Sequence, residues 1–340
     1  MSTQRPPTDP PRRADLHPIA IPTPFPVGPV NVFLWRGDPL TLIDTGPRTD
    51  EAYAALEAGL REHGVRVSDI ERVLLTHHHV DHVGLLRRVL EESGAVTFAH
   101  PDVPSENRPR AVDPGAWDAY FPRMLAELGV PEAEADVLTT FMADFRKLSE
   151  PYHIDTVYED GGDAAPFTTY FVPGHSVTDT LLLNHDGGYT ITGDHLLENI
   201  NPNPLIHRPA RPDMPRMKSL VAYQRSLRRA RALELGLCYP GHGAPFADHR
   251  RVIDGILAKH ARREARVLRL IAPEGVTPYT VARQLYPDMP PESLYLVLSV
   301  ALGHLEVLEE KGRLCSEHRN GVMIFKHAEC ETIVEAEAGS

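Results

Sequence analysis

Apolar residues follow two kinds of pattern along this 340-residue chain, short runs and helical stripes. The runs at 30–34, 40–43 and 73–75 are bounded by glycine, proline or polar residues, which is typical of buried strands. A stripe with a spacing of three or four residues predicts a helix over about 50–63, ending at Gly64. Strands that alternate with helices indicate an α/β fold. Periodicity alone also allows a doubly wound sheet.

A segment of about 50 residues, 101–150, interrupts this alternation. It opens with a proline-rich connector and continues with two amphipathic helices. Their apolar stripes are Trp117, Tyr120, Phe121, Met124, Leu125 and Leu128, and then Leu138, Phe141, Met142, Phe145 and Leu148. In one hypothesis this insertion is a lid that contacts substrate through Phe121 and Met142, with adaptable methionines. In the other, the stripes pack on the core or on a second subunit, which leaves a homodimer open.

The pattern changes again after about residue 265. Two helices are predicted at 277–285 and 292–311, followed by a strand pair around Asn320-Gly321, a favoured hairpin turn. This order predicts a winged-helix-like domain over 266–327. The longer helix is expected to expose its glutamates, which are Glu292, Glu306, Glu309 and Glu310. A structural or dimerising role is therefore favoured over DNA binding.

Composition narrows the class of protein. The net charge of −12 argues against a protein built around nucleic-acid phosphates. Three scattered cysteines provide no disulfide framework and indicate a reducing, cytoplasmic setting. No stretch reads as a membrane span. The proline-rich residues 1–16 and the acidic residues 328–340 are expected to be disordered tails.

The strongest chemical signal is an H-x-H-x-D-H motif made by His77, His79, Asp81 and His82. It lies between the apolar run 73–75 and a helical stripe that starts at residue 85, so it occupies a strand-to-helix loop. Residues two apart on an extended loop face the same way, so His77 and His79 can bind one metal ion. Asp81 and His82 then point towards a second ion.

Four further sites repeat one layout, in which an apolar run ends in a turn and one polar residue. The run before Asp44 is the first case. The others end at His175 in Pro-Gly-His, at Asp194 in Gly-Asp, and at His242 in Pro-Gly-His.

With these five motifs in this order, residues 17–250 resemble the metallo-β-lactamase-fold hydrolases. The resemblance implies an αββα sandwich as the catalytic domain, residues 17–265, with two divalent metal ions as cofactors. His77, His79 and His175 would hold the first ion, Asp81, His82 and His242 the second, and Asp194 would bridge them. Asp44 would orient the ligands from outside. Imidazole and carboxylate ligands suit zinc, and also iron or manganese. The C-terminal module resembles one found in the glyoxalase-II-like and lactamase-β-2-like members.

Several neighbouring residues are candidates for catalysis or substrate binding. His195 follows the bridging aspartate and could line the site, and Tyr223 opens a helix that could reach it. Arg208 and Arg211, in the loop after Asp194, could bind a carboxylate or phosphate through their guanidinium groups. The alternatives are a His195 side chain that points away from the ligands, a Tyr223 that does not reach the site, and a solvated basic loop for the arginines.

Two classes of function remain open. In the favoured one, a hydroxide that bridges the metal ions attacks a thioester, ester or lactone carbonyl of a small acyl substrate, such as an acyl-CoA or acyl-glutathione, and Asp81 manages the proton. In the other, the same metal ions cleave a phosphodiester, as in the lactamase-β-2-like endoribonucleases. The acidic composition and the lack of a basic, aromatic-rich surface favour the first.

Overall fold

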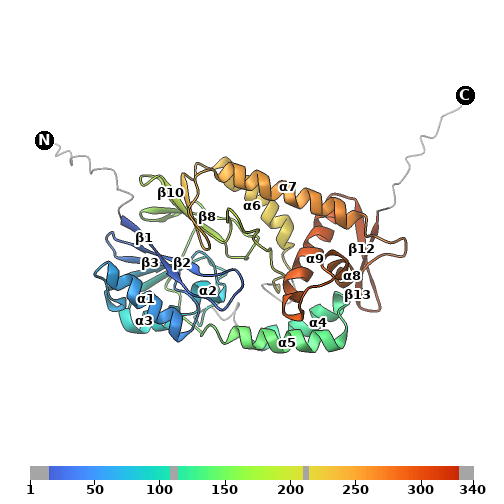
Figure 1. Cartoon of the computed structure of the whole chain (residues 1–340), viewed down its shortest axis with the longest axis horizontal. Helices are drawn as coiled ribbons and strands as arrows, with labels where there is room; N and C mark the ends of the chain where they lie inside the picture. Colours follow the sequence, from blue (N-terminus) through green and yellow to red (C-terminus); the bar gives the residue numbers. More distant parts are fainter. Residues whose placement is uncertain (1–14, 108–113, 210–213, 329–340) are drawn as a thin grey trace, which may run out of the picture.

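The computed structural model describes residues 15–107, 114–209 and 214–328. The tails expected at 1–16 and 328–340 therefore fall almost wholly outside the described residues. Two β-sheets face each other, and helices cover their outer faces (Figure 1). The first sheet runs in sequence order from β1 (Leu16–Ile21) through β2 (Val30–Trp35), β3 (Thr41–Ile43), β4 (Arg72–Leu74) and β5 (Val96–Ala99) to β6 (Thr156–Val157). The second has the order β11 (Leu237–Pro240), β10 (Tyr189–Gly193), β9 (Thr180–Asn184), β8 (Phe167–Phe171) and β7 (Asp163–Ala164).

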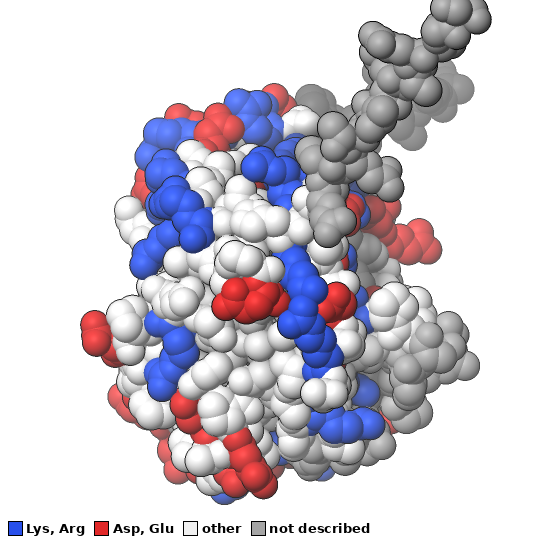
Figure 2. All heavy atoms as spheres, turned by 90° about the vertical axis from the view of Figure 1, so that its right-hand side faces the viewer, with Lys and Arg blue, Asp and Glu red and all other residues white. Residues whose placement is uncertain are grey.

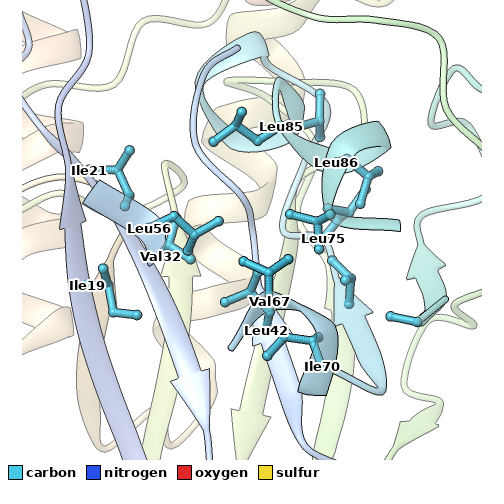
Figure 3. Close-up of a cluster of buried hydrophobic side chains, with 14 of the residues drawn as sticks. Ile19, Ile21, Val32, Leu42, Leu56, Val67, Ile70, Leu75, Leu85 and Leu86 are labelled. Atoms are coloured by element: carbon cyan, nitrogen blue, oxygen red, sulfur yellow. The ribbon is translucent and has the colours of Figure 1, made fainter. Parts of the chain in front are cut away.

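Alternation along the strands builds the layers. In β2, Val32 and Leu34 join a core under helices α1 (Asp50–Glu62) and α3 (Leu86–Ser93), whereas Phe33 points to the other sheet and meets Tyr239 at a ring-centroid distance of 5.9 Å. Successive strand residues face opposite sides, so each strand serves two cores. Figure 3 shows the outer core, with Val32, Leu42, Leu56 and Leu86 pointing together.

Helices α6 (Ser219–Ala232) and α7 (His249–Leu268) cover the outer face of the second sheet. The chain thus forms the expected αββα sandwich. Cys238 is part of this packing, because it is 0% exposed, and burial raises its pKa to about 12.

The strand ends set the place of the candidate ligands. Strands β3 and β4 are parallel to each other, and so are β10 and β11. Parallel strands end at the same edge of a sheet, so the loops after Ile43 and Leu74, and after Gly193 and Pro240, are presented side by side. The short helix α2 (Val80–Val83) follows the first histidine pair.

The insertion forms two helices, α4 (Pro114–Glu127) and α5 (Glu132–Arg146), as the stripes predict. These helices share a core with the C-terminal helices, in which Phe121 meets Tyr295 at 5.6 Å. Phe121 is 2% exposed and Met142 packs against the same core. The stripes thus pack on the C-terminal module, and a substrate contact by Phe121 or Met142 stays a prediction. The chain after α5 is tied to the catalytic part, because the amide of Arg48 donates to the carbonyl of Leu148 at 2.9 Å.

The C-terminal module contains α8 (Pro278–Leu285), the 3₁₀ turn Pro291–Ser293, α9 (Leu294–Glu310) and the hairpin β12 (Leu314–Arg319) and β13 (Val322–His327). The helix, helix, hairpin order is as expected, although α7 runs across the expected boundary at 265. Most of α9 is buried. Glu306 is 4% exposed and pairs with Arg216, so the expectation that it faces solvent is wrong.

One helical stretch among the described residues, Pro291–Glu310, is long and apolar enough to cross a membrane. Two thirds of its most apolar window is buried inside the protein. This burial is that of a core helix.

Candidate metal centre

The structure brings the seven predicted ligands into three overlapping groups of ligand atoms, each within 4.8 Å. The groups are His77, His79 and His175; His77, His82 and Asp194; and Asp81, His82 and His242. The first and third are the two sets expected for separate ions, and the second joins them. Every ligand comes from a loop at a strand end or from α2, so the rigid sheets fix their positions.

Asp194 lies between the two sets. Its Oδ2 is 3.5 Å from Nε2 of His175 and 3.5 Å from Nε2 of His242, and its Oδ1 is 3.6 Å from Nε2 of His82. Two further separations are similar, 3.1 Å between His77 Nε2 and His79 Nδ1 and 3.3 Å between His242 Nε2 and Asp81 Oδ2. Ligand atoms about 2.0–2.1 Å from a tetrahedral ion stand about 3.3 Å from each other. The side chains are thus spaced as the ligands of a bound metal ion would be, and the Asp194 carboxylate faces both sets.

Asp44 contacts the candidate ligand His82 from outside the centre. Its Oδ2 lies 2.8 Å from Nδ1 of His82, and its Oδ1 accepts a hydrogen bond from the amide of Thr76 at 2.9 Å. The Thr76 hydroxyl donates to Asp44 Oδ2 at 2.7 Å. With Nδ1 engaged, Nε2 of His82 is left to face the centre, which is the role expected for Asp44.

Backbone carbonyls orient two other imidazoles. Nδ1 of His175 lies 2.9 Å from the carbonyl of Asn203, and Nδ1 of His242 lies 2.8 Å from that of Pro29. A carbonyl only accepts, so Nδ1 carries the proton and the Nε2 lone pair points inward. The ring orientation is thus fixed from loops distant in sequence.

Burial and charge polarise the centre. Burial lowers the pKa of His77 and of His79, and neighbouring histidines add to the effect. Burial also opposes a charge on His82, but the carboxylates of Asp44, Asp194 and Asp81 raise its pKa well above the usual value. Against burial, His82, His242 and His175 hold the pKa of Asp194 below its usual range.

Several buried atoms here have no hydrogen-bond partner among the described residues. They include Nε2 of His82, His175 and His242, and Oδ1 of Asp194. Buried polar atoms almost always have a partner, so these three nitrogens around the Asp194 carboxylate fit bound cations. Nitrogen and carboxylate oxygen without a thiolate suit a divalent ion such as zinc, iron or manganese.

Tyr223 and His195, which were expected to contact substrate, are both buried. Tyr223 is 0% exposed, and its hydroxyl donates to the carbonyl of His195 at 2.7 Å. The His195 ring is 1% exposed, packs edge-on against Tyr223, and has a pKa lowered to about 3 by burial. Both side chains are as buried as the candidate ligands His77 and His82, and their roles towards a substrate stay predictions.

The loop after Asp194 approaches the centre at His207. The His207 ring lies parallel to that of His79, with centroids 6.1 Å apart. Arg208 follows it and is partly buried, whereas Arg211 falls outside the described residues. The roles of both arginines stay predictions.

Sequence reasoning missed two polar groups around the ligands. Asp179 is 2% exposed and accepts the amide of Ser176 at 2.8 Å, which fixes the turn after His175. Its place three residues after Ser176 was a usable signal, because aspartate caps local backbone amides. The carbonyl of Asn203 had no such signal, since any residue type provides one.

The model of the metallo-beta-lactamase superfamily matches residues 25–242, which include all seven ligands. The chain belongs to this superfamily. A probable metallo-hydrolase, YqjP, from Bacillus subtilis is 36% identical over 92% of this chain and 98% of its own length. An atrochrysone carboxyl ACP thioesterase from Aspergillus fumigatus is 25% identical over 69% of this chain and 57% of its own length.

A solved structure extends the similarity to the C-terminal module. The metallo-beta-lactamase family protein TTHA1429 from Thermus thermophilus superposes with a TM-score of 0.79 and 27% identity, over 92% of this chain and 99% of its own. The superfamily binds divalent metals, and this member is a metallo-hydrolase with histidine and aspartate clusters for them.

Proposed function

We propose that the chain is a binuclear metal-dependent hydrolase that hydrolyses a small acyl thioester or ester. The observation that carries the proposal is the position of Asp194, whose carboxylate faces His175 on one side and His82 and His242 on the other. Similarity to a fungal thioesterase supports the acyl substrate.

The chemistry that two divalent ions supply when bound is polarisation of a carbonyl and activation of water. The chain's own residues prepare this centre. Asp44 and the carbonyls of Asn203 and Pro29 hold three imidazoles with Nε2 inward. The Asp81 Oδ2, 3.3 Å from His242 Nε2, is placed to hold a proton that leaves the attacking water.

The loop that orients His242 also makes an apolar contact, to which we assign the acyl group. Phe25 stacks on Phe145 of α5 with ring centroids 4.9 Å apart. Phe25 belongs to the loop that ends at Pro29, whose carbonyl orients His242. Phe141, one turn earlier on α5, is 40% exposed. These rings replace Phe121 and Met142 as the apolar selectors.

The test is hydrolysis of acyl-CoA thioesters of increasing chain length. The rate is measured from the release of the thiol. Each methylene that is buried contributes about 0.8 kcal/mol, so kcat/KM should rise up to about fourfold per carbon until the apolar site is full. Phe145→Ala should flatten this rise. Val137→Ala is the matched control, because Val137 lies two turns earlier on α5 and is 54% exposed.

Two results would contradict the proposal. One is that no thioester, ester or lactone is hydrolysed by the metal-loaded protein. The other is cleavage of a phosphodiester at a higher rate than any acyl substrate, which would favour the nuclease alternative.

A further inference from the structure

Helix α6 contacts two of the loops that carry predicted metal ligands. The Tyr223 hydroxyl donates to the carbonyl of His195, one residue after Asp194. Gly174, one residue before His175, lies so close to Tyr223 that a Cβ atom there would be 2.4 Å from the Tyr223 Cβ. One buried side chain therefore touches the backbone next to two ligands.

Ser226 extends this support. Its hydroxyl donates to the carbonyl of Pro173 at 2.8 Å. Tyr223 and Ser226 are three residues apart and so lie on one face of α6. Both hold the chain that leads into His175, and Tyr223 alone also holds the chain that leaves Asp194.

Helix α9 of the C-terminal module packs against α6. A Cβ atom at Gly303 would lie 2.8 Å from the Cβ of Leu220, so the two helices are in close contact. Lys218 pairs with Glu309 at 2.8 Å, and Arg225 pairs with Glu310 at 2.5 Å. These pairs lie on both sides of the Leu220 contact along α6.

We propose that Tyr223 is a positioning residue for the metal centre, and that α9 of the C-terminal module holds it in place through α6. The inference rests on the proposed function only in taking the same seven side chains as metal ligands. It gives the C-terminal module a role in metal binding, although none of the seven ligands belongs to it. Because Asp194 faces both ligand sets, loss of the support should lower the affinity for both ions.

The first test is Tyr223→Phe, which removes the hydroxyl and keeps the ring. Affinity for Co²⁺ is measured by competition with a chelator, and the visible absorption of bound Co²⁺ reports ligand geometry. Partners that orient ligands are worth 10–100-fold in metal affinity, so we expect a loss of about 10-fold for both ions and a changed spectrum.

Tyr189→Phe is the matched control. Tyr189 is 2% exposed, its hydroxyl accepts from Asn184 at 3.1 Å, and it lies at the other end of β10 from Asp194. This variant should lose stability without a change in metal affinity. If Tyr223→Phe behaves like Tyr189→Phe, the hydroxyl serves packing alone and the inference is overturned.

The second test acts from the C-terminal module. Gly303→Ala forces α9 away from Leu220, and should weaken Co²⁺ binding in the same direction as Tyr223→Phe. Gly255→Ala is its control, because a Cβ atom at Gly255 in α7 meets nothing within 4 Å. Metal affinity that is equal in the two glycine variants would overturn the role of α9. Gly303→Ala also decides the matter if Tyr223→Phe does not fold.

Failure of this inference is distinct from failure of the proposed function. If the unmodified protein binds two ions and hydrolyses thioesters while both variants bind metal normally, only the inference fails. If the variants lose metal affinity but no acyl substrate is hydrolysed, only the proposed function fails.

Discussion

Oδ2 of Asp44 lies 2.8 Å from Nδ1 of His82, and the two side chains are 1% and 0% exposed. The backbone of Asp44 has a φ of 59°, in the left-handed region where aspartate and asparagine are the residues other than glycine that fit most readily. Conformation and hydrogen bonding thus call for the same residue type at the end of β3.

This pairing gives the first prediction. Asp44→Asn keeps the size and tolerates the backbone conformation, but it replaces the charged acceptor. We expect metal affinity to fall by about 10–100-fold, with the larger effect on the ion held by His82. Metal titration followed by elemental analysis measures this. Asp69→Asn, at an exposed surface pair, is the control, and equal affinity in the two variants would contradict the prediction.

Metal content gives the second prediction. Seven ligands predict about two equivalents of metal per chain in protein purified without chelator. Asp194→Ala should cost both ions, whereas His242→Ala should cost mainly one, because only Asp194 faces both sets. Elemental analysis of each variant decides this. A single equivalent that added metal does not raise would contradict a binuclear site.

The third prediction concerns pH and stability. His260 of α7 is 2% exposed. Burial, and after it the positive charge of Arg263, lowers its pKa to about 4. In the unfolded chain its pKa is about 6.5, so the unfolded state takes up a proton first as the pH falls. Stability that is present above pH 6.5 is therefore lost progressively as the pH falls from about 6.5 to about 4.

Urea unfolding of the metal-free protein should show this loss. Between about pH 7 and pH 5, His260 should account for roughly 1–2 kcal/mol of the decrease in unfolding free energy. His260→Gln should remove that part, whereas His185→Gln, at an exposed position, should not. The same decrease in both variants would show that His260 does not contribute.

The fourth prediction concerns nucleic acid. The longest helix of the C-terminal module, α9, packs on α6 and α7 with most residues buried, so it is not free to enter a groove. Figure 2 shows the side of the molecule that carries this module, where basic side chains form short groups with acidic and uncharged ones between them. RNA binding, measured by fluorescence anisotropy, should be weak and lost at moderate salt. Tight, salt-resistant binding would contradict this.

The sequence was sufficient for the metal centre because its information is local. His77, His79, Asp81 and His82 lie in one short loop, and each remaining ligand directly follows a strand. The spacing predicted that His77 and His79 face one point, and the resemblance to the family implied which of the other side chains join them. Their joint occurrence also selected the αββα sandwich over a doubly wound sheet.

What each helix packs against was not predictable in the same way. An apolar stripe shows that a face is buried, but it does not name the partner. Phe121 was therefore assigned to a substrate lid, whereas it packs on Tyr295. Glu306 was assigned to solvent because its charge suggested it, but Arg216, distant in sequence, allows it to be buried. The partner of Tyr223 was not predictable either, since it is a backbone carbonyl.

The core that α4 and α5 share with the C-terminal helices has a consequence for synthesis on the ribosome. The insertion leaves the ribosomal exit tunnel well before Tyr295 has been translated. Until then, Phe121 and its neighbours have no native partner to pack against. During that interval their apolar faces are open to aggregation or to a chaperone. We expect nascent chains stalled before α9 to be sensitive to protease within α4 and α5, and full-length chains to be protected there.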